Sequence, residues 1–109
     1  MAVTGVHKAE RTLYLSHLEK IEKSHTLHSS ESLRKLLRYL GEHALDHPGI
    51  PLKEYQIATE VFGRPAAFDP QVDSTIRVQA GRLRMKLAEY YASEGVDDPV
   101  QVELSLIHI

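Results

Sequence analysis

The sequence predicts a mainly α-helical domain that ends in a short β-strand, and three observations lead to this fold class. Apolar residues recur at helical spacing in four segments between residues 8 and 93. Prolines at residues 48–51 and 65–70 separate the last three of these segments, at places where proline stops a helix. Residues 100–104 then alternate between apolar and polar side chains, as a strand with one buried face does.

Composition limits the class of protein. The 109 residues suffice for one domain, with 42% hydrophobic and 26% charged residues, as in ordinary globular proteins. The sequence has no cysteine, which excludes a disulfide scaffold, a thiol nucleophile and a Cys-based zinc site. No apolar run is long enough to span a membrane, and residues 1–8 do not resemble a secretory signal, so we expect a cytoplasmic protein. Because the formal net charge is −2, any basic surface must be local.

Two amphipathic helices are expected in the first half of the chain. After a frayed terminus at residues 1–7, residues 8–23 carry a narrow apolar stripe at Tyr14, Leu18 and Ile21. Residues 24–29 connect it to a second helix, for which Ser29 or Ser30 is the expected N-cap because a hydroxyl accepts a free first-turn amide. The stripe of the second helix, which stops at residues 46–49, consists of Leu33, Leu36, Leu37, Leu40 and Ala44.

A short helix, a loop and a long helix follow. Residues 52–62 have a helical pattern that ends at Gly63, and their inward side consists of Ile57, Ala58, Val61 and Phe62. Two prolines fix the loop at residues 64–70, and Phe68 attaches it to the core. The long helix is expected from Asp73 to about Ser93.

The long helix has two different sides, because successive residues are about 100° apart. The side expected in the core consists of Ile76, Ala80, Leu83, Leu87, Tyr90 and Tyr91. The opposite side consists of Ser74, Thr75, Val78, Gly81, Arg82 and Met85. One flank carries Arg77 and Arg84, and the other carries Gln79 and Lys86. From Ile76 to Leu87 there are four cations and no acid, and Glu89 then closes this basic zone.

This layout favours insertion of the long helix into a DNA major groove. Its outward residues are small or slender, so Thr75 and Val78 can meet thymine methyls and Arg82 can donate two hydrogen bonds to a guanine. Phosphates on the groove walls are within reach of Arg77, Gln79, Arg84 and Lys86, and of Arg64 from the preceding loop. Gly81 costs about 1 kcal/mol relative to alanine, which close approach of another backbone would offset.

Two other interpretations fit the same face. A charged helical face is often only solvated, and so is a loop arginine such as Arg64. Alternatively, Val78, Gly81 and Met85 receive a partner helix, since small residues permit close packing. The chain would then be a protein-interaction or dimerisation module of a larger bacterial signalling protein. The residues alone leave these alternatives open.

The order of elements resembles a winged helix-turn-helix. Residues 61–63 (Val-Phe-Gly), 73–76 (Asp-Ser-Thr-Ile) and 82–87 (Arg-Leu-Arg-Met-Lys-Leu) resemble the DNA-binding effector domain of bacterial two-component response regulators. More narrowly, residues 52–104 resemble an N-terminal winged-helix module of uncharacterised, often multidomain, bacterial proteins. The resemblance implies transcription regulation through double-stranded DNA, with a recognition helix whose contact positions are Thr75, Arg77, Gln79, Arg82 and Arg84.

The chain also departs from this family. Gly81 and Met85 stand where response regulators often have basic residues, so the cationic patch is thinner. No receiver domain is present, so no phosphorylation switch can be inferred. The family's wing continues through a Gly-containing turn into a second strand, whereas residues 105–109 do not follow that pattern. We therefore expect an N-terminal helical extension at residues 1–28 and, at residues 29–109, a winged-helix domain with a truncated C-terminal β wing.

Nothing in the sequence predicts an enzyme. It has no Gly-rich phosphate loop, no nucleophile elbow and no carboxylate pair with an evident pocket. His43 and His47 are four residues apart, and His25 and His28 three, but no third metal ligand follows at a suitable spacing. We expect no catalytic residue, no metal, no cofactor and no membrane contact; a homodimer or further domains of a longer parent protein are possible partners besides DNA.

Overall fold

The computed structural model describes residues 8–98, with side chains from Arg11 onward. This part of the chain forms four helices: α1 (Lys8–Glu22), α2 (Glu31–Asp46), α3 (Glu54–Glu60) and α4 (Thr75–Ala92). The prediction of a mainly helical domain is therefore confirmed. The predicted frayed terminus at residues 1–7 and the predicted wing, with its strand at residues 100–104, lie outside the described residues.

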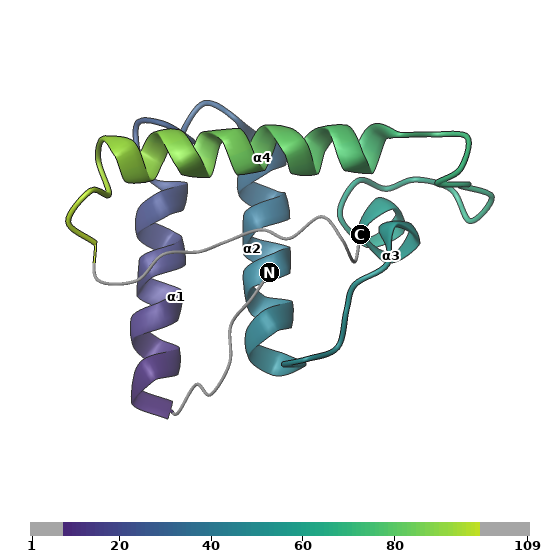
Figure 1. Ribbon diagram of the computed structural model, residues 1–109. Coiled ribbons are helices and arrows are strands. Elements are labelled where there is room, and N and C mark those ends of the chain that lie inside the picture. Colours follow the sequence, from purple (N-terminus) through teal and green to yellow (C-terminus); the bar gives the residue numbers. More distant parts are fainter. Residues whose placement is uncertain (1–7, 99–109) are drawn as a thin grey trace.

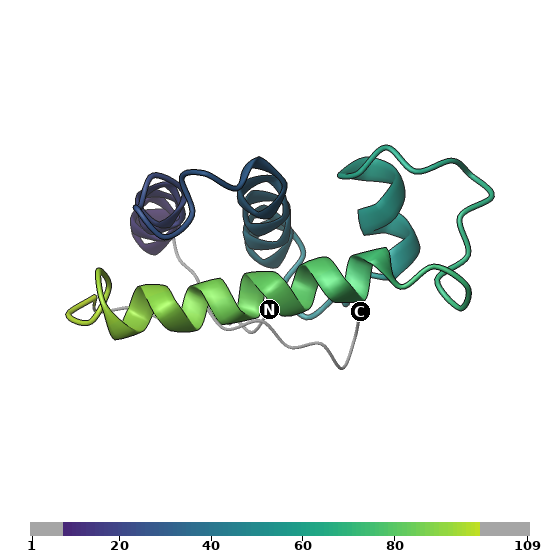
Figure 2. The same ribbon diagram turned by 90° about the horizontal axis from the view of Figure 1, so that it is seen from above.

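The helices form two layers. Helices α1 and α2 lie side by side and antiparallel, and α4 crosses them near the end at which they are connected (Figure 1). Helix α3 packs beside the N-terminal part of α4 (Figure 2). Helix α4 is thus supported from one side by α2 and α3, and its opposite side faces away from them.

One hydrophobic core joins all four helices, including both segments that were predicted as an N-terminal extension and a winged-helix domain. The predicted stripes of α1 and α2 are buried in it, with Leu18, Ile21 and Leu36 completely inaccessible to solvent. Leu27 and Leu52, in the connections before α2 and α3, are also buried. Their burial was not predicted: Leu27 lies in a turn, and Leu52, expected at the start of the helical pattern, lies before the first residue of α3.

Helices α1 and α2 approach each other closely at Gly41. A Cβ atom at this position would lie 2.3 Å from Cδ1 of Leu18, which is completely buried. Only a residue without a side chain fits there while Leu18 keeps its place. Gly41 therefore sets the spacing of the helix pair that carries α4.

The connection between α1 and α2 is held differently from the prediction. Ser30 is the N-cap of α2, but its side chain makes no capping hydrogen bond, so the expected hydroxyl cap was wrong. Instead, Ser24 Oγ donates to the carbonyl oxygen of Ile21 at 2.6 Å. From beyond the end of α4, the Glu94 carboxylate accepts the backbone amides of His25 at 3.0 Å and Thr26 at 2.9 Å. This contact attaches the α1–α2 connection to the C-terminal end of α4.

The segment before α4 positions the start of that helix. Helix α3 is shorter than predicted, with Val61 as its C-cap, and Gly63 follows at φ +63°, the left-handed region that favours glycine. The resulting turn lets the amide of Arg64 donate to the carbonyl of Ala58 at 2.9 Å. Phe68 packs against the core, as predicted for this loop.

Helix α4 begins two residues later than predicted. Its N-cap is Ser74, which makes no side-chain capping bond, while Asp73 Oδ1 accepts the backbone amide of Thr75 at 2.9 Å and also the Thr75 hydroxyl. The hydrogen bond from this hydroxyl, followed by that from the amide, lowers the pKa of Asp73. A charged Asp73 beside the first turn is also favourable to the helix dipole.

Within residues 8–98, none of the helices combines the length and the apolar character that a membrane crossing requires.

Candidate nucleic-acid interface

The inner side of α4 lies in the core as the sequence predicts. Ile76, Ala80, Leu83, Leu87 and Tyr90 are buried along it, and Tyr91 packs half-buried against the same core. The predicted division of this helix into an inner and an outer side is therefore confirmed.

The centre of the outer side is apolar and open. Val78 is 54% exposed and Met85 is 65% exposed. Between them, a Cβ atom at Gly81 would meet nothing within 4 Å. Close approach of another backbone, expected as an offset for this helical glycine, is thus not provided by the described part of the chain itself.

Two arginines project from the outer part of α4 without partners. Arg82 and Arg84 are exposed, and within residues 8–98 neither has an ion pair or a hydrogen bond to another residue. Their charges are therefore not neutralised by the fold around them. This is the property that a phosphate-binding side chain needs.

Arg77 and Lys86 are partly engaged within the fold. Arg77 Nη2 donates to the carbonyl oxygen of Pro70 at 2.9 Å, and its Nε lies 3.6 Å from Oε1 of Glu54. Lys86 Nζ lies 3.3 Å from Glu89 Oε2. Both cations stay about half exposed. The Lys86–Glu89 pair is exposed on both sides and contributes only about 0–1 kcal/mol to stability, so a phosphate can compete for Lys86. Glu54 is only 10% exposed, so Arg77 also neutralises a largely buried carboxylate and is less available to a phosphate.

The structure brings Arg64 to the start of α4. Arg64 Nη2 donates to Oγ1 of Thr75 at 3.2 Å, so a loop arginine joins the cations of the helix on one surface. The Thr75 hydroxyl, which also donates to Asp73, is occupied by local bonds.

Gln79 is the predicted contact residue that the structure favours least. Its Oε1 atom is buried and has no hydrogen-bond partner in the fold. A buried amide oxygen cannot accept a hydrogen bond from a base edge, so Gln79 does not present its whole amide group outward.

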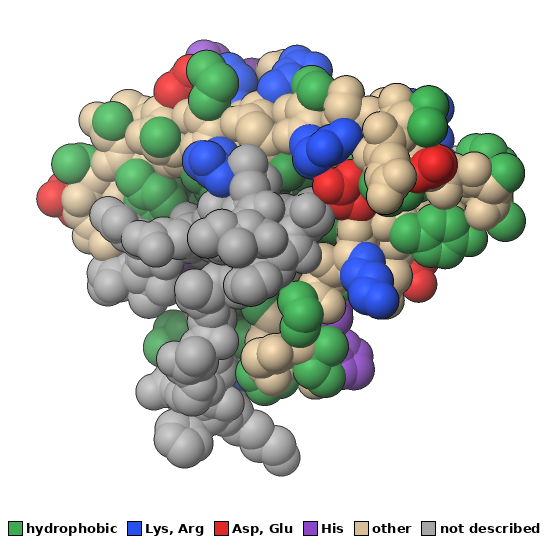
Figure 3. Space-filling model, turned by 45° about the vertical axis from the view of Figure 1, so that its right-hand side comes forward, with side chains coloured by type: hydrophobic (Ala, Val, Ile, Leu, Met, Phe, Trp, Pro, Cys, Tyr) green, Lys and Arg blue, Asp and Glu red, His purple; other side chains and the backbone are tan. Residues whose placement is uncertain are grey.

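The other predicted cations come from α4 and from the loop before it. Figure 3 shows Lys and Arg side chains along the upper part of the molecule, where α4 runs, together with hydrophobic side chains and some Asp and Glu side chains. We define the α4 outer face by its described members: Thr75, Arg77, Val78, Gly81, Arg82, Arg84, Met85 and Lys86.

A polar cluster at the other end of α4 was not foreseen from the sequence. Asp98, whose side chain is 6% exposed, accepts a hydrogen bond from the hydroxyl of Tyr90 at 2.7 Å and pairs with Lys20 of α1. His17 Nδ1 lies 3.8 Å from Asp98 Oδ2, and His17 Nε2 lies 2.8 Å from the hydroxyl oxygen of Tyr91. These residues are up to 81 positions apart in sequence (98 − 17), so no local pattern could have joined them.

The titration behaviour of this cluster follows from its contacts. Hydrogen bonds from Lys20 and then Tyr90 lower the pKa of Asp98. Burial lowers the pKa of His17, although the nearby Asp98 carboxylate opposes that effect. Burial, followed by the bond to Asp98, raises the pKa of Tyr90. The cluster thus contains a charged aspartate and a neutral histidine near pH 7, and it attaches α4 to α1.

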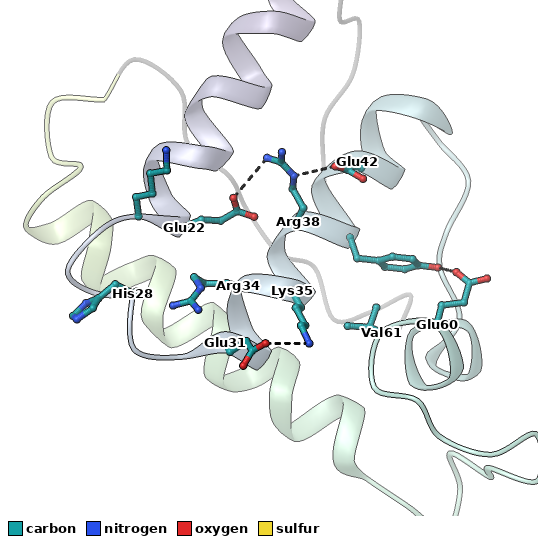
Figure 4. A pocket seen from close by; sticks show the side chains of 11 residues that line it. Glu22, His28, Glu31, Arg34, Lys35, Arg38, Glu42, Glu60 and Val61 are labelled. Atoms are coloured by element: carbon teal, nitrogen blue, oxygen red, sulfur yellow. Dashed lines mark hydrogen bonds and ion pairs between the residues drawn. The ribbon is translucent and has the colours of Figure 1, made fainter.

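A shallow groove of about 910 Å³ lies between the end of α1, helix α2 and the end of α3 (Figure 4). Four cations and four acids line it, and most pair with one another. Arg38 lies between Glu22 and Glu42, at 3.6 Å and 2.9 Å, and Lys35 pairs with Glu31. Because its charges balance, this groove has no net attraction for an anion, unlike the α4 outer face.

The histidine pairs noted in the sequence are close in space. The rings of His25 and His28 stack with centroids 5.1 Å apart, and those of His43 and His47 are 5.2 Å apart. His43 Nε2 is bonded to the carbonyl oxygen of Ile50 at 2.7 Å, so this nitrogen is a donor. In the part of the chain that the structure describes, no three His, Asp or Glu residues gather as a metal site would require.

No model of a known protein family matches the chain, and no curated protein or solved structure matches it either. The resemblance to response-regulator effector domains therefore stays a prediction from the residues.

Proposed function

We propose that the chain is a DNA-binding module of the winged helix-turn-helix type, which acts in transcription regulation by inserting α4 into the major groove. The observation that carries this proposal is the α4 outer face, where Arg82 and Arg84 project without partners among the described residues. The rest of the described fold has cations too, but most of them pair with an acidic side chain.

The length of α4 and the way it is supported are consistent with this proposal. Helix α4 has 18 residues, which corresponds to a rod of about 27 Å at 1.5 Å per residue. The major groove is about 12 Å wide and admits one α-helix. Since α2 and α3 support α4 only from behind, its outer face can enter the groove without any rearrangement of the described residues.

The side chains divide into two roles. Arg82 and Arg84 supply the strongest contacts, because no internal partner must first be released. Arg64 and Arg77 lie near the start of α4 and add phosphate contacts there, after giving up hydrogen bonds to Thr75 and Pro70. Glu89 limits the surface toward the C-terminal end of the helix, where it pairs with Lys86.

The salt dependence of binding to random duplex DNA tests the proposal. With about four to six phosphate contacts, the association constant falls by roughly two to three decades between 50 and 200 mM salt. Replacing Arg84 by alanine lowers the slope of log K against log salt by about one, and Arg82→Ala/Arg84→Ala lowers it by about two.

Lys23→Ala is the matched control for this test. Lys23 is 75% exposed, directly after α1, and it lines the groove beside α2 rather than the α4 outer face, so its loss should leave the slope unchanged. A flat salt response of the wild-type chain, or equal binding by the arginine double variant, would contradict DNA binding through α4.

A second candidate function is a protein-interaction or dimerisation module. The high exposure of Val78 and Met85 favours it, because apolar side chains on a helix face can pack on a second helix. Met85→Glu then abolishes self-association or partner capture. A monomer in sedimentation, together with a Met85→Glu variant that is altered only in DNA binding, excludes this alternative.

A further inference from the structure

We propose that the strip formed by Val78, Gly81 and Met85 contacts the C5-methyl groups of pyrimidines in the major groove, those of thymine or 5-methylcytosine. This inference rests on the proposed DNA binding and names the chemistry that the helix recognises. In this arrangement the apolar strip at the centre of α4 contacts the bases, and the arginines mainly contact the phosphates.

The three residues form one line along α4. They occupy positions i, i+3 and i+7 of the helix and lie opposite the buried Leu83 and Leu87. Val78 and Met85 are more than half exposed, so this line lies on the solvent side of α4.

Gly81 makes a shallow depression between two apolar side chains. With no atom within 4 Å of a Cβ placed there, the helix backbone can approach base edges closely at this point. The C5-methyl group is the apolar feature that a pyrimidine presents in the major groove. Met85 can adapt to its position, because methionine is unbranched and flexible.

The charges beside the strip indicate the kind of partner. Arg77 and Arg84 lie on one flank and Arg82 and Lys86 on the other, with no acid between Ile76 and Leu87. Two rows of cations on either side of an apolar line match the two phosphate walls of a groove and the methyl groups between them.

The strip alone supplies far less surface than the roughly 1,200–2,000 Å² that a stable protein interface buries, so a protein partner would need further contacts around it. Contact with two or three methyl groups needs far less surface. Thr75, predicted as a methyl contact, is partly buried, and its hydroxyl is held by Arg64 and Asp73.

Replacing thymine by deoxyuridine tests this inference, because that change removes only the methyl group. A duplex is first selected with the wild-type chain from a random pool, and each of its thymines is then replaced in turn. We expect about fourfold weaker binding for each contacted methyl group, and about fifteenfold when two are removed.

A second arm distinguishes the two sources of the methyl group. At a position where uracil weakens binding, the base pair is changed to cytosine–guanine, with and without a methyl group on cytosine. Recovery of affinity with 5-methylcytosine supports contact with the methyl group from either base. Recovery with thymine alone identifies thymine as the base that is recognised.

Variants connect the effect to the strip. In Val78→Ala/Met85→Ala, thymine and uracil duplexes should bind equally, while the salt dependence stays steep. Leu13→Ala is the control, because Leu13 is 69% exposed on α1 and should leave the preference for thymine intact.

The outcomes separate this inference from the proposed function. If the wild-type chain binds thymine and uracil duplexes equally but with a steep salt dependence, methyl recognition is wrong and DNA binding stands. If it binds no duplex from the pool at any salt concentration, both proposals are wrong.

Discussion

The helix pair α1–α2 and the outer face of α4 each contain a glycine within a helix, and the surroundings of the two glycines are opposite. At Gly41 a Cβ atom would lie 2.3 Å from Leu18, whereas at Gly81 it would meet nothing within 4 Å. A glycine in a helix costs about 1 kcal/mol relative to alanine wherever it occurs. At Gly41 the close packing of Leu18 explains why a glycine is present despite this cost. At Gly81 no contact among residues 8–98 explains it.

The polar side chains show the same contrast. Asp98, beyond the end of α4, is bonded to Tyr90 and Lys20, and it lies close to His17. Arg82 and Arg84, toward the middle of the same helix, have no partner among the described residues. One end of α4 is therefore built to hold the fold together, while its centre is left free for contacts outside it.

The largest expected effect is at the closely packed helix pair. Leu18→Ala removes a completely buried side chain and should lower the free energy of unfolding by about 2–5 kcal/mol, measured by urea denaturation. In that background Gly41→Ala should restore about 1 kcal/mol, because the atom with which its methyl group would collide is gone. In the wild-type background, the same change at Gly41 should destabilise. Equal effects of Gly41→Ala in the two backgrounds would show that the Leu18 side chain is not the reason why residue 41 must be glycine.

The next largest effect is expected at the polar cluster. Tyr90→Phe removes the hydroxyl that donates to Asp98 while the buried ring remains, and it should cost about 1–2 kcal/mol in thermal or urea unfolding. Tyr55→Phe is a matched control, because Tyr55 is 41% exposed and its hydroxyl donates to the carbonyl of Ala66 rather than to a carboxylate. Equal losses in the two variants would exclude a special role for Asp98.

Gly81→Ala should stabilise the fold, whereas most substitutions destabilise it. The free energy of unfolding should rise by about 1 kcal/mol, since the new methyl group enters open space and favours the helix. If DNA approaches the backbone at Gly81, the same variant should bind duplex DNA more weakly. A variant that is more stable and binds DNA as well as the wild-type chain does would mean that nothing approaches this position.

The smallest expected effect is a pH dependence from His17. Because its pKa is lower in the folded state than in the unfolded chain, the unfolded state binds more protons as pH falls below about 6.5. Stability should therefore fall between about pH 7 and pH 5, and His17→Gln should remove part of that slope in urea titrations. Exposed His47, changed to glutamine, is the control. If the pH dependence of stability is the same in His17→Gln as in the wild-type chain, His17 does not contribute to it.

Sequence patterns predicted the features that repeat along a helix. The buried sides of α1, α2 and α4 follow from residues at helical spacing, such as Tyr14, Leu18 and Ile21, because a helix that packs on a core must be apolar on one side. The start of α4 was placed only within two residues, because Asp73 and Ser74 are both good capping residues and only their geometry distinguishes them.

Contacts between distant residues could not be predicted in this way. Nothing near Arg64 in the sequence indicates that its guanidinium lies beside Thr75, and nothing near Glu94 indicates the amides of His25 and Thr26. Of the predicted contact residues, Gln79 has its amide oxygen turned into the fold, whereas Arg82 and Arg84 remain exposed. Periodicity gives the side of a helix on which a residue lies, but not which neighbour occupies that side.

Amide chemical shifts during titration with random duplex DNA test the role of α4 most directly. If α4 enters the major groove, the largest shifts should occur from Thr75 to Met85 and at Arg64, and the buried Tyr14, Leu18 and Ile21 of α1 should shift little. Shifts confined to the groove along α2, or no shifts at low salt, would contradict DNA binding through this helix.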